Sequence, residues 1–327
     1  MRRRKFIVLL GSSAIFWPAT TLAQQPRVWR IGWLDAGSSA RSEYLEVFQQ
    51  ELKELGYDEG RNLIIEQRFA EGEIDRLRAL AENLVGKNVD IVLAVSSFAV
   101  QAAKGATKEI PIVMTGVGDP EHSGFVAGIT RPGGNITGLT NVSIEISSKY
   151  LELLHAALPT MKRVGVMTDP AHPNHPTVLN QVRDSAKAFG IEVSQIEVPS
   201  FDEIQKPITD AVTLQRVQAL IIPPHPVWQA KVGRIVELVQ KKNRLPTMFG
   251  LSGAVEAGGL MSYLPSYRDM YRRAAALVDK ILKGTIPADL PVEFPTRFEL
   301  TLNLRTADEL GLQVPADLRV RADKVIE

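Results

Sequence analysis

The sequence predicts an α/β protein built of two doubly wound, parallel-sheet lobes. Its 327 residues are about right for two domains of roughly 150 residues each. Short apolar runs alternate with amphipathic stretches, as strands alternate with covering helices in a parallel sheet. The alternation runs through two successive series of similar size, so the repetition indicates two lobes and not a short-period solenoid.

The first series begins at a buried strand that ends in the polar loop Asp35–Arg41. Each later apolar run is separated from the next by a helical stretch, which is the pattern of crossover connections. The predicted strands cover residues 30–34, 63–69, 90–95 and 110–115, and the predicted helices cover 44–55, 77–85 and 97–105.

The second series repeats this order after residue 140. Its predicted helices cover 144–158, 177–189, 203–217 and 227–242, and its predicted strands cover 163–168, 191–198, 219–223 and 246–249. The tail is different, because it supplies spare elements that neither series needs. It contains predicted strands over 260–263 and 298–304, a strong helix over 267–282, and helical pieces over 307–310 and 316–326. A chain that returns to complete both lobes would supply such elements.

The composition excludes several classes of protein. Lys and Arg total 38 against 37 Asp and Glu, so the net charge of +1 argues against a nucleic-acid binder. The chain has no cysteine, which excludes disulfides, thiolate metal sites, cysteine nucleophiles and lipid attachment at cysteine.

The first 23 residues have the pattern of a secretory signal peptide. Basic residues at 2–5 precede a short apolar run over 6–17, and small residues follow at 21–23. The pattern leaves two export routes open, an ordinary signal and the twin-arginine route. Cleavage after Ala23 would leave 34 basic and 37 acidic residues, a net charge of −3. We therefore expect a soluble periplasmic protein without a lipid anchor.

Ligands of parallel α/β sheets bind at the carboxyl ends of the strands. The loops to examine there are 35–41, 96–98, 116–124, 169–177, 223–228 and 249–253, which are rich in Ser, Gly, Pro, His and Asn. Each candidate also has a structural interpretation, because serines cap helices, Asp before Pro makes turns, and aromatic residues fill cores. The candidate ligand-binding residues are Ser38, Ser39, Ser96, Ser97, Phe98, Asp119, Pro120, Asp169, His172, Asn174, His175, His225, Trp228, Phe249 and Tyr263.

Catalytic motifs are missing from the sequence. It contains no phosphate-binding P-loop, no dinucleotide-binding glycine motif and no Gly-x-Ser-x-Gly elbow. His172, His175 and His225 suggest a metal site, but Pro173 and Pro176 break any helix that would place the first two on one face. We expect hydrogen-bonding or loop histidines there, and no metal or cofactor.

Four segments carry a resemblance to a known family. They are Arg131–Asn141 (RPGGNITGLTN), Val255–Tyr263 (VEAGGLMSY) and the tail segments Leu282–Glu293 (LKGTIPADLPVE) and Phe298–Leu304 (FELTLNL). The chain resembles the substrate-binding proteins of ABC transporters, in the group that includes tryptophan- and tyrosine-type binding components. The similarity extends over essentially the whole chain after the signal.

The resemblance implies a type I periplasmic-binding-protein fold, in which a multi-strand hinge joins two lobes that close on a ligand. We expect an N-terminal lobe of residues 27–140 plus 253–288 and a C-terminal lobe of residues 141–252 plus 289–327. The implied function is capture of a small organic ligand, an amino acid or an aromatic or branched organic acid. The expected partner is an inner-membrane ABC permease, and the protein is expected to act as a monomer. Two alternatives stay open: an exported hydrolase using Asp119 or His175, and a ligand sensor for a membrane receptor.

Overall fold

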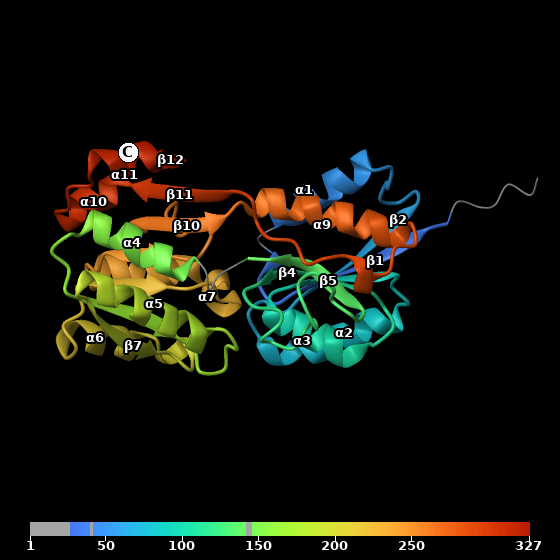
Figure 1. The fold of residues 1–327 in the computed structure, drawn as a ribbon, viewed down its shortest axis with the longest axis horizontal. Helices are drawn as coiled ribbons and strands as arrows, with labels where there is room; N and C mark the ends of the chain where they lie inside the picture. The colour runs from blue at the N-terminus through green and yellow to red at the C-terminus, as the bar shows by residue number, and fades with distance from the viewer. Residues whose placement is uncertain (1–26, 40–41, 142–145) are drawn as a thin grey trace, which may run out of the picture.

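Two α/β lobes lie side by side, each built around its own sheet (Figure 1). The computed structural model describes residues 27–39, 42–141 and 146–327, so the predicted export signal lies outside the described residues. The two-lobe α/β architecture predicted from the sequence is confirmed. Among the described residues, no helix combines the length and apolar character needed to cross a bilayer.

The N-terminal lobe contains a sheet of five parallel strands in the order β2-β1-β3-β4-β5. This order follows from right-handed crossovers that build outward on both sides of β1. The strands are β1 (Trp29–Asp35), β2 (Leu63–Phe69), β3 (Ile91–Val95), β4 (Ile112–Val117) and β5 (Ile136–Thr140).

Helices cover both faces of this sheet. On one face, α1 (Ser42–Glu54) packs beside α9 (Tyr267–Leu282), which comes from the far end of the sequence (Figure 1). On the other face lie α2 (Leu77–Gly86) and α3 (Ser97–Ala106), with the short η2 (Ile74–Arg76) before them. Alternate residues of β3 therefore enter different cores: Leu93 joins the α1 and α9 side and Val92 the α2 and α3 side.

The C-terminal lobe contains a seven-stranded sheet in the order β12-β11-β10-β9-β8-β6-β7. All its neighbouring pairs are parallel except β10 and β11. The strands are β6 (Arg163–Thr168), β7 (Glu192–Glu197), β8 (Ala219–Ile222), β9 (Thr247–Phe249), β10 (Met261–Pro265), β11 (Phe298–Asn303) and β12 (Lys324–Ile326).

The second sheet is also covered on both faces. One face packs against α4 (Ser147–Ala157), α5 (His175–Phe189), α10 (Leu304–Leu310) and α11 (Ala316–Arg321). The other packs against η3 (Phe201–Glu203), α6 (Gln205–Thr213), α7 (Pro226–Ala230), α8 (Val232–Val236) and the π-helical turn η4 (Glu237–Lys242). The single helix predicted over 227–242 is thus three consecutive pieces.

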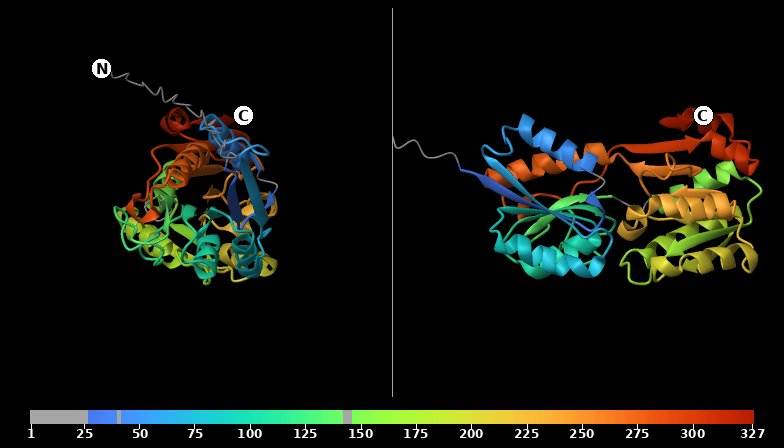
Figure 2. Two further views of the ribbon diagram at one scale, coloured as in Figure 1. Left: turned by 90° about the vertical axis from the view of Figure 1, so that its right-hand side faces the viewer. Right: turned by 180° about the vertical axis from the view of Figure 1, so that it is seen from behind.

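Three connections join the lobes, as the back view in Figure 2 shows for those at the C-terminal end. The chain passes from β5 to α4, from β10 to α9, and from the segment after η5 (Pro287–Asp289) to β11. The last two connections run side by side, because the Ser266 N–H donates to the Arg297 carbonyl at 2.9 Å. Paired connections of this kind allow the lobes to rotate while staying attached.

Two of the three crossings lie later in the sequence than expected. Residues 253–265 pack in the second lobe, because β10 pairs with β9 and β11. Residues 289–293 stay with the first lobe, where the Thr140 N–H donates to the Glu293 carbonyl and Glu293 N–H to the Gly138 carbonyl. The extreme tail also differs, since residues 324–326 form β12 beside β11 and not the end of a helix.

Candidate functional site

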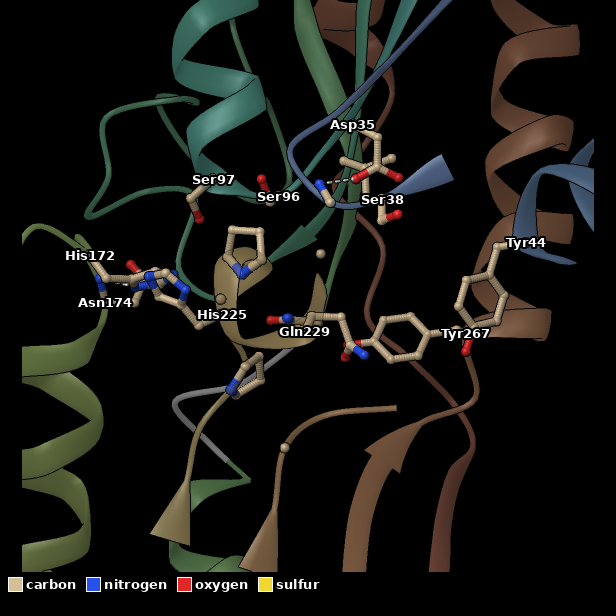
Figure 3. A pocket seen from close by; sticks show the side chains of 18 of the residues that line it. Asp35, Ser38, Tyr44, Ser96, Ser97, His172, Asn174, His225, Gln229 and Tyr267 are labelled. Carbon is tan, nitrogen blue, oxygen red and sulfur yellow. Dashed lines mark hydrogen bonds between the residues drawn. The ribbon is translucent and has the colours of Figure 1, made fainter. Parts of the chain in front are cut away.

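A cavity of about 90 Å³ lies between the two lobes (Figure 3). A single water needs roughly 10–15 Å³, so the space suits a small molecule. Its N-terminal-lobe wall comprises Trp33, Asp35, Gly37, Ser38, Tyr44, Val95, Ser96, Ser97, Gly116, Gly118, Tyr267 and Tyr271. Its C-terminal-lobe wall comprises His172, Asn174, Pro224, His225, Pro226, Gln229 and Gly250, and Asn141 lies at the first crossing. All six strand-end loops singled out in the sequence supply lining residues.

The start of α3 provides one group of hydrogen-bond donors. Ser96 is the N-cap, and its side chain accepts the Ala99 N–H at 3.4 Å. The N–H groups of Ser97 and Phe98, in the first turn, have no acceptor among the described residues. Free N–H groups at a helix N-terminus favour an anion, and the ten residues of α3 add the helix dipole.

Ser96 itself is held in a strained conformation. Its backbone angles are φ +89° and ψ 158°, a region that only glycine adopts without cost. The Ser96 N–H donates to the Thr115 carbonyl at 2.9 Å, so strand pairing and the N-cap fix the conformation from both sides. Strain of this kind is often concentrated at ligand-binding sites.

Asp35 is the one lining residue with a formal charge in the described part of the chain. It ends β1, and its Oδ1 accepts the Gly37 N–H at 2.7 Å, which orients the carboxylate. The neighbouring Ser38 donates a side-chain hydrogen bond to Glu71. This hydrogen bond and a second one from the Ser39 N–H lower the pKa of Glu71. An acidic side chain in a cavity whose described lining is otherwise uncharged is suited to a ligand ammonium group.

Aromatic rings form the wall on the α1 and α9 side. Tyr271 stacks on Trp33 with 5.4 Å between ring centroids and on Tyr44 with 5.3 Å. Tyr267 lies one helical turn before Tyr271 and contacts Tyr44 at 5.5 Å. Figure 3 shows Tyr267 and Tyr44 on the side of the cavity away from His172. This wall would pack well against an apolar or aromatic part of a ligand.

Three buried histidines lie together at the opposite wall, which His172 and His225 line and His175 supports from behind. His172 and His175 stack with their ring centroids 4.0 Å apart, and His225 lies 5.3 Å and 5.5 Å from them. His225 caps α7 and stacks on the fully buried Trp228 at 4.5 Å. Phe98 of the other lobe meets His172 and His225 edge-on at 5.3 Å and 5.9 Å. The three imidazoles thus form part of the lobe interface.

Backbone contacts determine the tautomers of these rings. The Nδ1 atoms of His172, His175 and His225 each accept a backbone N–H, from Asn174, Asp169 and Val227 respectively. A neutral ring that accepts at Nδ1 carries its proton on Nε2. His225 Nε2–H then donates to Asp169 Oδ2 at 2.9 Å, and His175 Nε2–H to the Pro224 carbonyl at 3.4 Å.

Burial keeps the three rings neutral. It lowers the pKa of His175 to about 3, helped by the nearby His225 and opposed by the Pro224 carbonyl and Asp169. Burial likewise lowers the pKa of His172 well below its ordinary value, with the other two rings adding to the effect. Burial also lowers the pKa of His225, although Asp169 opposes it. For Asp169, burial acts to raise the pKa, but the hydrogen bonds from His225 and Ala171 outweigh it and the pKa is lowered.

Hydrogen bonds to protein groups occupy every nitrogen of the three rings except His172 Nε2. Within the described ranges, no group of three or more His, Asp or Glu side chains is arranged to hold a metal ion. The hydrogen-bonding interpretation of these histidines fits the geometry instead.

Two hydrogen bonds join the lobes beside the cavity. The Tyr44 hydroxyl lies 2.8 Å from Ser252 Oγ, and Ser123 Oγ donates to Asn174 Oδ1 at 3.3 Å. Ser252 is held by Gln229 through two backbone contacts, Gln229 Nε2 to the Ser252 carbonyl at 2.8 Å and Ser252 N–H to Gln229 Oε1 at 2.9 Å. The lobes are therefore closed in this structure.

The structure brings together some of the residues proposed from the sequence. Those that line the cavity are Ser38, Ser96, Ser97, His172, Asn174 and His225. Phe98, Asp169, His175 and Trp228 stand directly behind the lining and contact its histidines. Ser39, Asp119 and Pro120 lie in turns outside it, where the Asp119 carboxylate accepts the His122 N–H. Phe249 is a core residue beside β8, and Tyr263 packs on Phe298 away from the cavity.

Several residues that line the cavity were not among the ligand-binding residues predicted from the sequence. Trp33, Tyr44, Tyr267 and Tyr271 belong to apolar strand or helix faces, where a cavity wall and a core have the same pattern. Gln229 lies just beyond the loop that was singled out. Asp35 began such a loop, and its position at the end of β1 was a signal that could have found it.

Comparison with known proteins gives consistent matches. Residues 37–326 match the family described as ABC transporter substrate binding protein. A tyrosine-binding protein of Clostridioides difficile is 29% identical over 267 residues, covering 81% of this chain and 76% of the relative.

Solved structures are also similar. An ABC domain from Streptococcus pneumoniae in complex with L-Trp has 26% identity and a TM-score of 0.84, covering 91% of this chain and 100% of that one. A leucine-binding protein from Thermotoga maritima, 13% identical with a TM-score of 0.62, covers 78% of this chain and 83% of that one and supports the fold alone.

Proposed function

The chain belongs to the family of ABC transporter substrate-binding proteins, and on that premise we propose that it captures an aromatic α-amino acid. The bound amino acid would be passed to the membrane permease of the importer. The family binds solutes and does not transform them, so the hydrolase alternative is set aside. His175 is one candidate for that alternative, but both of its ring nitrogens form hydrogen bonds to the backbone. Nδ1 accepts the Asp169 N–H, and Nε2 bonds to the Pro224 carbonyl.

The observation that carries the proposal is the combination of groups in one closed cavity. Asp35 suits an ammonium group, and the free N–H groups at the start of α3 suit a carboxylate. Trp33, Tyr44, Tyr267 and Tyr271 supply an aromatic wall. A zwitterionic amino acid with an aromatic side chain would match all three features. The L-Trp complex and the tyrosine-binding relative point to the same ligand class.

Membership of this family also supports a location in the periplasm. The family works outside the cytoplasm, and the basic and apolar pattern of residues 1–23 supports export to the periplasm. A ligand that contacts both lobes favours the closed form, which is the form a permease would receive. The protein would act as a monomer.

Thermal unfolding against a panel of ligands tests the proposal. The panel contains the twenty amino acids, the aromatic amines and acids derived from them, and simple sugars. A ligand at a hundredfold excess over its Kd stabilises the folded protein by about 2.7 kcal/mol. We expect tyrosine, tryptophan or phenylalanine to raise Tm most. Stabilisation by sugars alone, or by none of the panel, would rule the proposal out.

A further inference from the structure

One end of the cavity collects hydrogen-bond donors from both lobes. The N-terminal lobe contributes the start of α3, where Ser97 lines the cavity and the Ser97 and Phe98 N–H groups have no acceptor among the described residues. The C-terminal lobe contributes His172, whose ring is 5.3 Å from that of Phe98. Figure 3 shows Ser97 and His172 on the same side of the cavity, with Tyr44 and Tyr267 on the other.

His172 has one nitrogen to spare for a ligand. Its Nδ1 accepts the Asn174 N–H at 3.3 Å, which places the proton on Nε2. The His172 side chain is only 8% exposed, and its Nε2–H has no acceptor among the described residues and opens to the cavity that the ring lines. A ligand that fills the cavity would cut this donor off from water, which is costly unless an oxygen of the ligand accepts the N–H.

The neighbouring residues hold the ring in place. His172 stacks on His175, which is fixed at both nitrogens, by the Asp169 N–H and the Pro224 carbonyl. Asp169 in turn holds His225 at 2.9 Å. Asp169, His175 and His225 are therefore positioning residues for His172. Burial keeps the His172 ring itself uncharged, so His172 offers a neutral donor.

We infer that His172 Nε2–H donates to the carboxylate of the bound amino acid, which is thereby shared between the lobes. The α3 N-terminus would hold one side of the carboxylate and His172 the other. The ligand carboxylate would then couple binding to closure, because only the closed form brings both sets of donors to it. This inference rests on the proposed function.

The opposite orientation of the ligand fits less well. An indole or phenyl ring placed against His172 offers no strong acceptor for the Nε2–H. It would also leave the carboxylate near Asp35, the one charged residue lining the described cavity. Placing the carboxylate at the His172 end avoids that repulsion and leaves the aromatic wall for the side chain.

The test compares ligands that differ only in the carboxylate. Titration calorimetry would measure tyrosine against tyramine and tryptophan against tryptamine, with competition experiments for the weak amines. His172→Phe keeps a ring between His175 and Phe98 but removes the donor, and His172→Gln restores an N–H donor. His155→Phe, which changes a ring packed on Phe189 outside the cavity, is the matched control.

We expect His172→Phe to weaken amino-acid binding roughly tenfold or more, the loss expected for one hydrogen bond to a charged group. Amine binding should change less than twofold, and His172→Gln should recover part of the affinity. Equal losses for amino acid and amine, or no loss, would overturn the inference while leaving the proposed function intact. If the wild type binds no aromatic amino acid, the proposed function fails and the inference with it.

Discussion

His225 Nε2 lies 2.9 Å from Asp169 Oδ2, and both side chains are buried, with His225 in the cavity wall and Asp169 behind it. Asp169 Oδ1 also accepts the Ala171 N–H at 2.8 Å. One carboxylate thus holds a turn of the 169–175 loop and the histidine that caps α7. The two loops of the C-terminal-lobe wall are therefore joined by a single side chain.

Replacing Asp169 should destabilise the protein. Asp169→Ala leaves the His225 N–H and the Ala171 N–H without their acceptor, and each unsatisfied buried donor costs about 1–3 kcal/mol. We expect a loss of about 2 kcal/mol or more in the free energy of unfolding, measured by urea denaturation. Asp184→Ala, at an exposed position on α5, is the control and should cost little. A stable Asp169→Ala variant would contradict a structural role for the pair.

Stability should fall in mild acid because of the three buried histidines. Their pKa values are lowered in the folded state, so below about pH 6.5 the unfolded chain binds protons that the folded chain does not. The stability present above that pH is lost as the pH falls toward the folded-state values. Below about pH 6.5, each histidine that stays neutral in the folded state lowers the free energy of unfolding by about 1.4 kcal/mol per pH unit.

Urea denaturation at pH 7.5, 6 and 5 measures this effect. His175→Gln removes one of the titrating groups and should give a shallower pH dependence than the wild type. Wild-type stability that is the same at pH 7.5 and pH 5 would show that the cluster stays accessible to protons in the folded protein.

Tyr44→Phe should loosen the closed form. The substitution keeps the rings stacked on Tyr271 and removes the 2.8 Å contact with Ser252. A net loss of about 1 kcal/mol per hydrogen bond corresponds to roughly a fivefold weaker affinity, expressed as faster ligand dissociation. Stopped-flow fluorescence measures both rates.

Tyr57→Phe is the control for this experiment. It removes a hydrogen bond of 2.9 Å from the Tyr57 hydroxyl to Asp279, within the N-terminal lobe. It should lower stability without changing ligand dissociation. Equal effects of both variants on dissociation would argue against an interlobe role for Tyr44.

Gly250→Ala should impair binding more than folding. A Cβ at Gly250 would lie 2.7 Å from Pro224 Cδ and 3.0 Å from the Tyr150 hydroxyl, so the Pro224 loop must shift. That loop carries the His175 contact and His225, and we expect affinity to fall at least tenfold. Gly86→Ala, where a Cβ meets nothing within 4 Å, should leave calorimetric affinity unchanged. Normal affinity in Gly250→Ala would show that the loop tolerates the shift.

Asp35→Asn should affect only ligands that carry an amine. The amide retains an oxygen for the Gly37 N–H but loses the charge. We expect roughly a tenfold or greater loss for tyrosine and little change for 3-(4-hydroxyphenyl)propionate, which lacks the amino group. Asp119→Asn lies outside the cavity and is the matched control. A comparable loss in Asp119→Asn would mean that the cavity is not where the amine binds.

Much of the fold could be predicted from apolar periodicity. The strands over 63–69 and 163–168 and the helix over 267–282 have the predicted limits, because strong patterns end at polar or glycine residues there. Strand β5 was missed, since Ile136–Thr140 reads as a connection until its pairing with β4 is known. Long-range pairing is not encoded in any local pattern.

The candidate site could likewise be predicted only in part from the sequence. Strand-end position identified the loops, because parallel strands bring their carboxyl ends to one edge. It could not identify Tyr44 and Tyr271, which lie on different helices and meet only when α9 returns to the first lobe. Nor could spacing show that His172 faces the cavity while His175 stands behind it, since backbone contacts at each ring decide that.

The late return of α9 has a consequence for biogenesis. Phe48 of α1 and Leu277 of α9 share one hydrophobic cluster, so the first lobe has an open apolar face until the ribosome has made residues 267–293. By then strands β6 to β10 of the second lobe have already been made. A nascent chain stalled before Tyr267 would expose that face, and a fragment ending at residue 140 would be prone to aggregation. The core of the first lobe therefore cannot be completed until nearly the whole chain has been made.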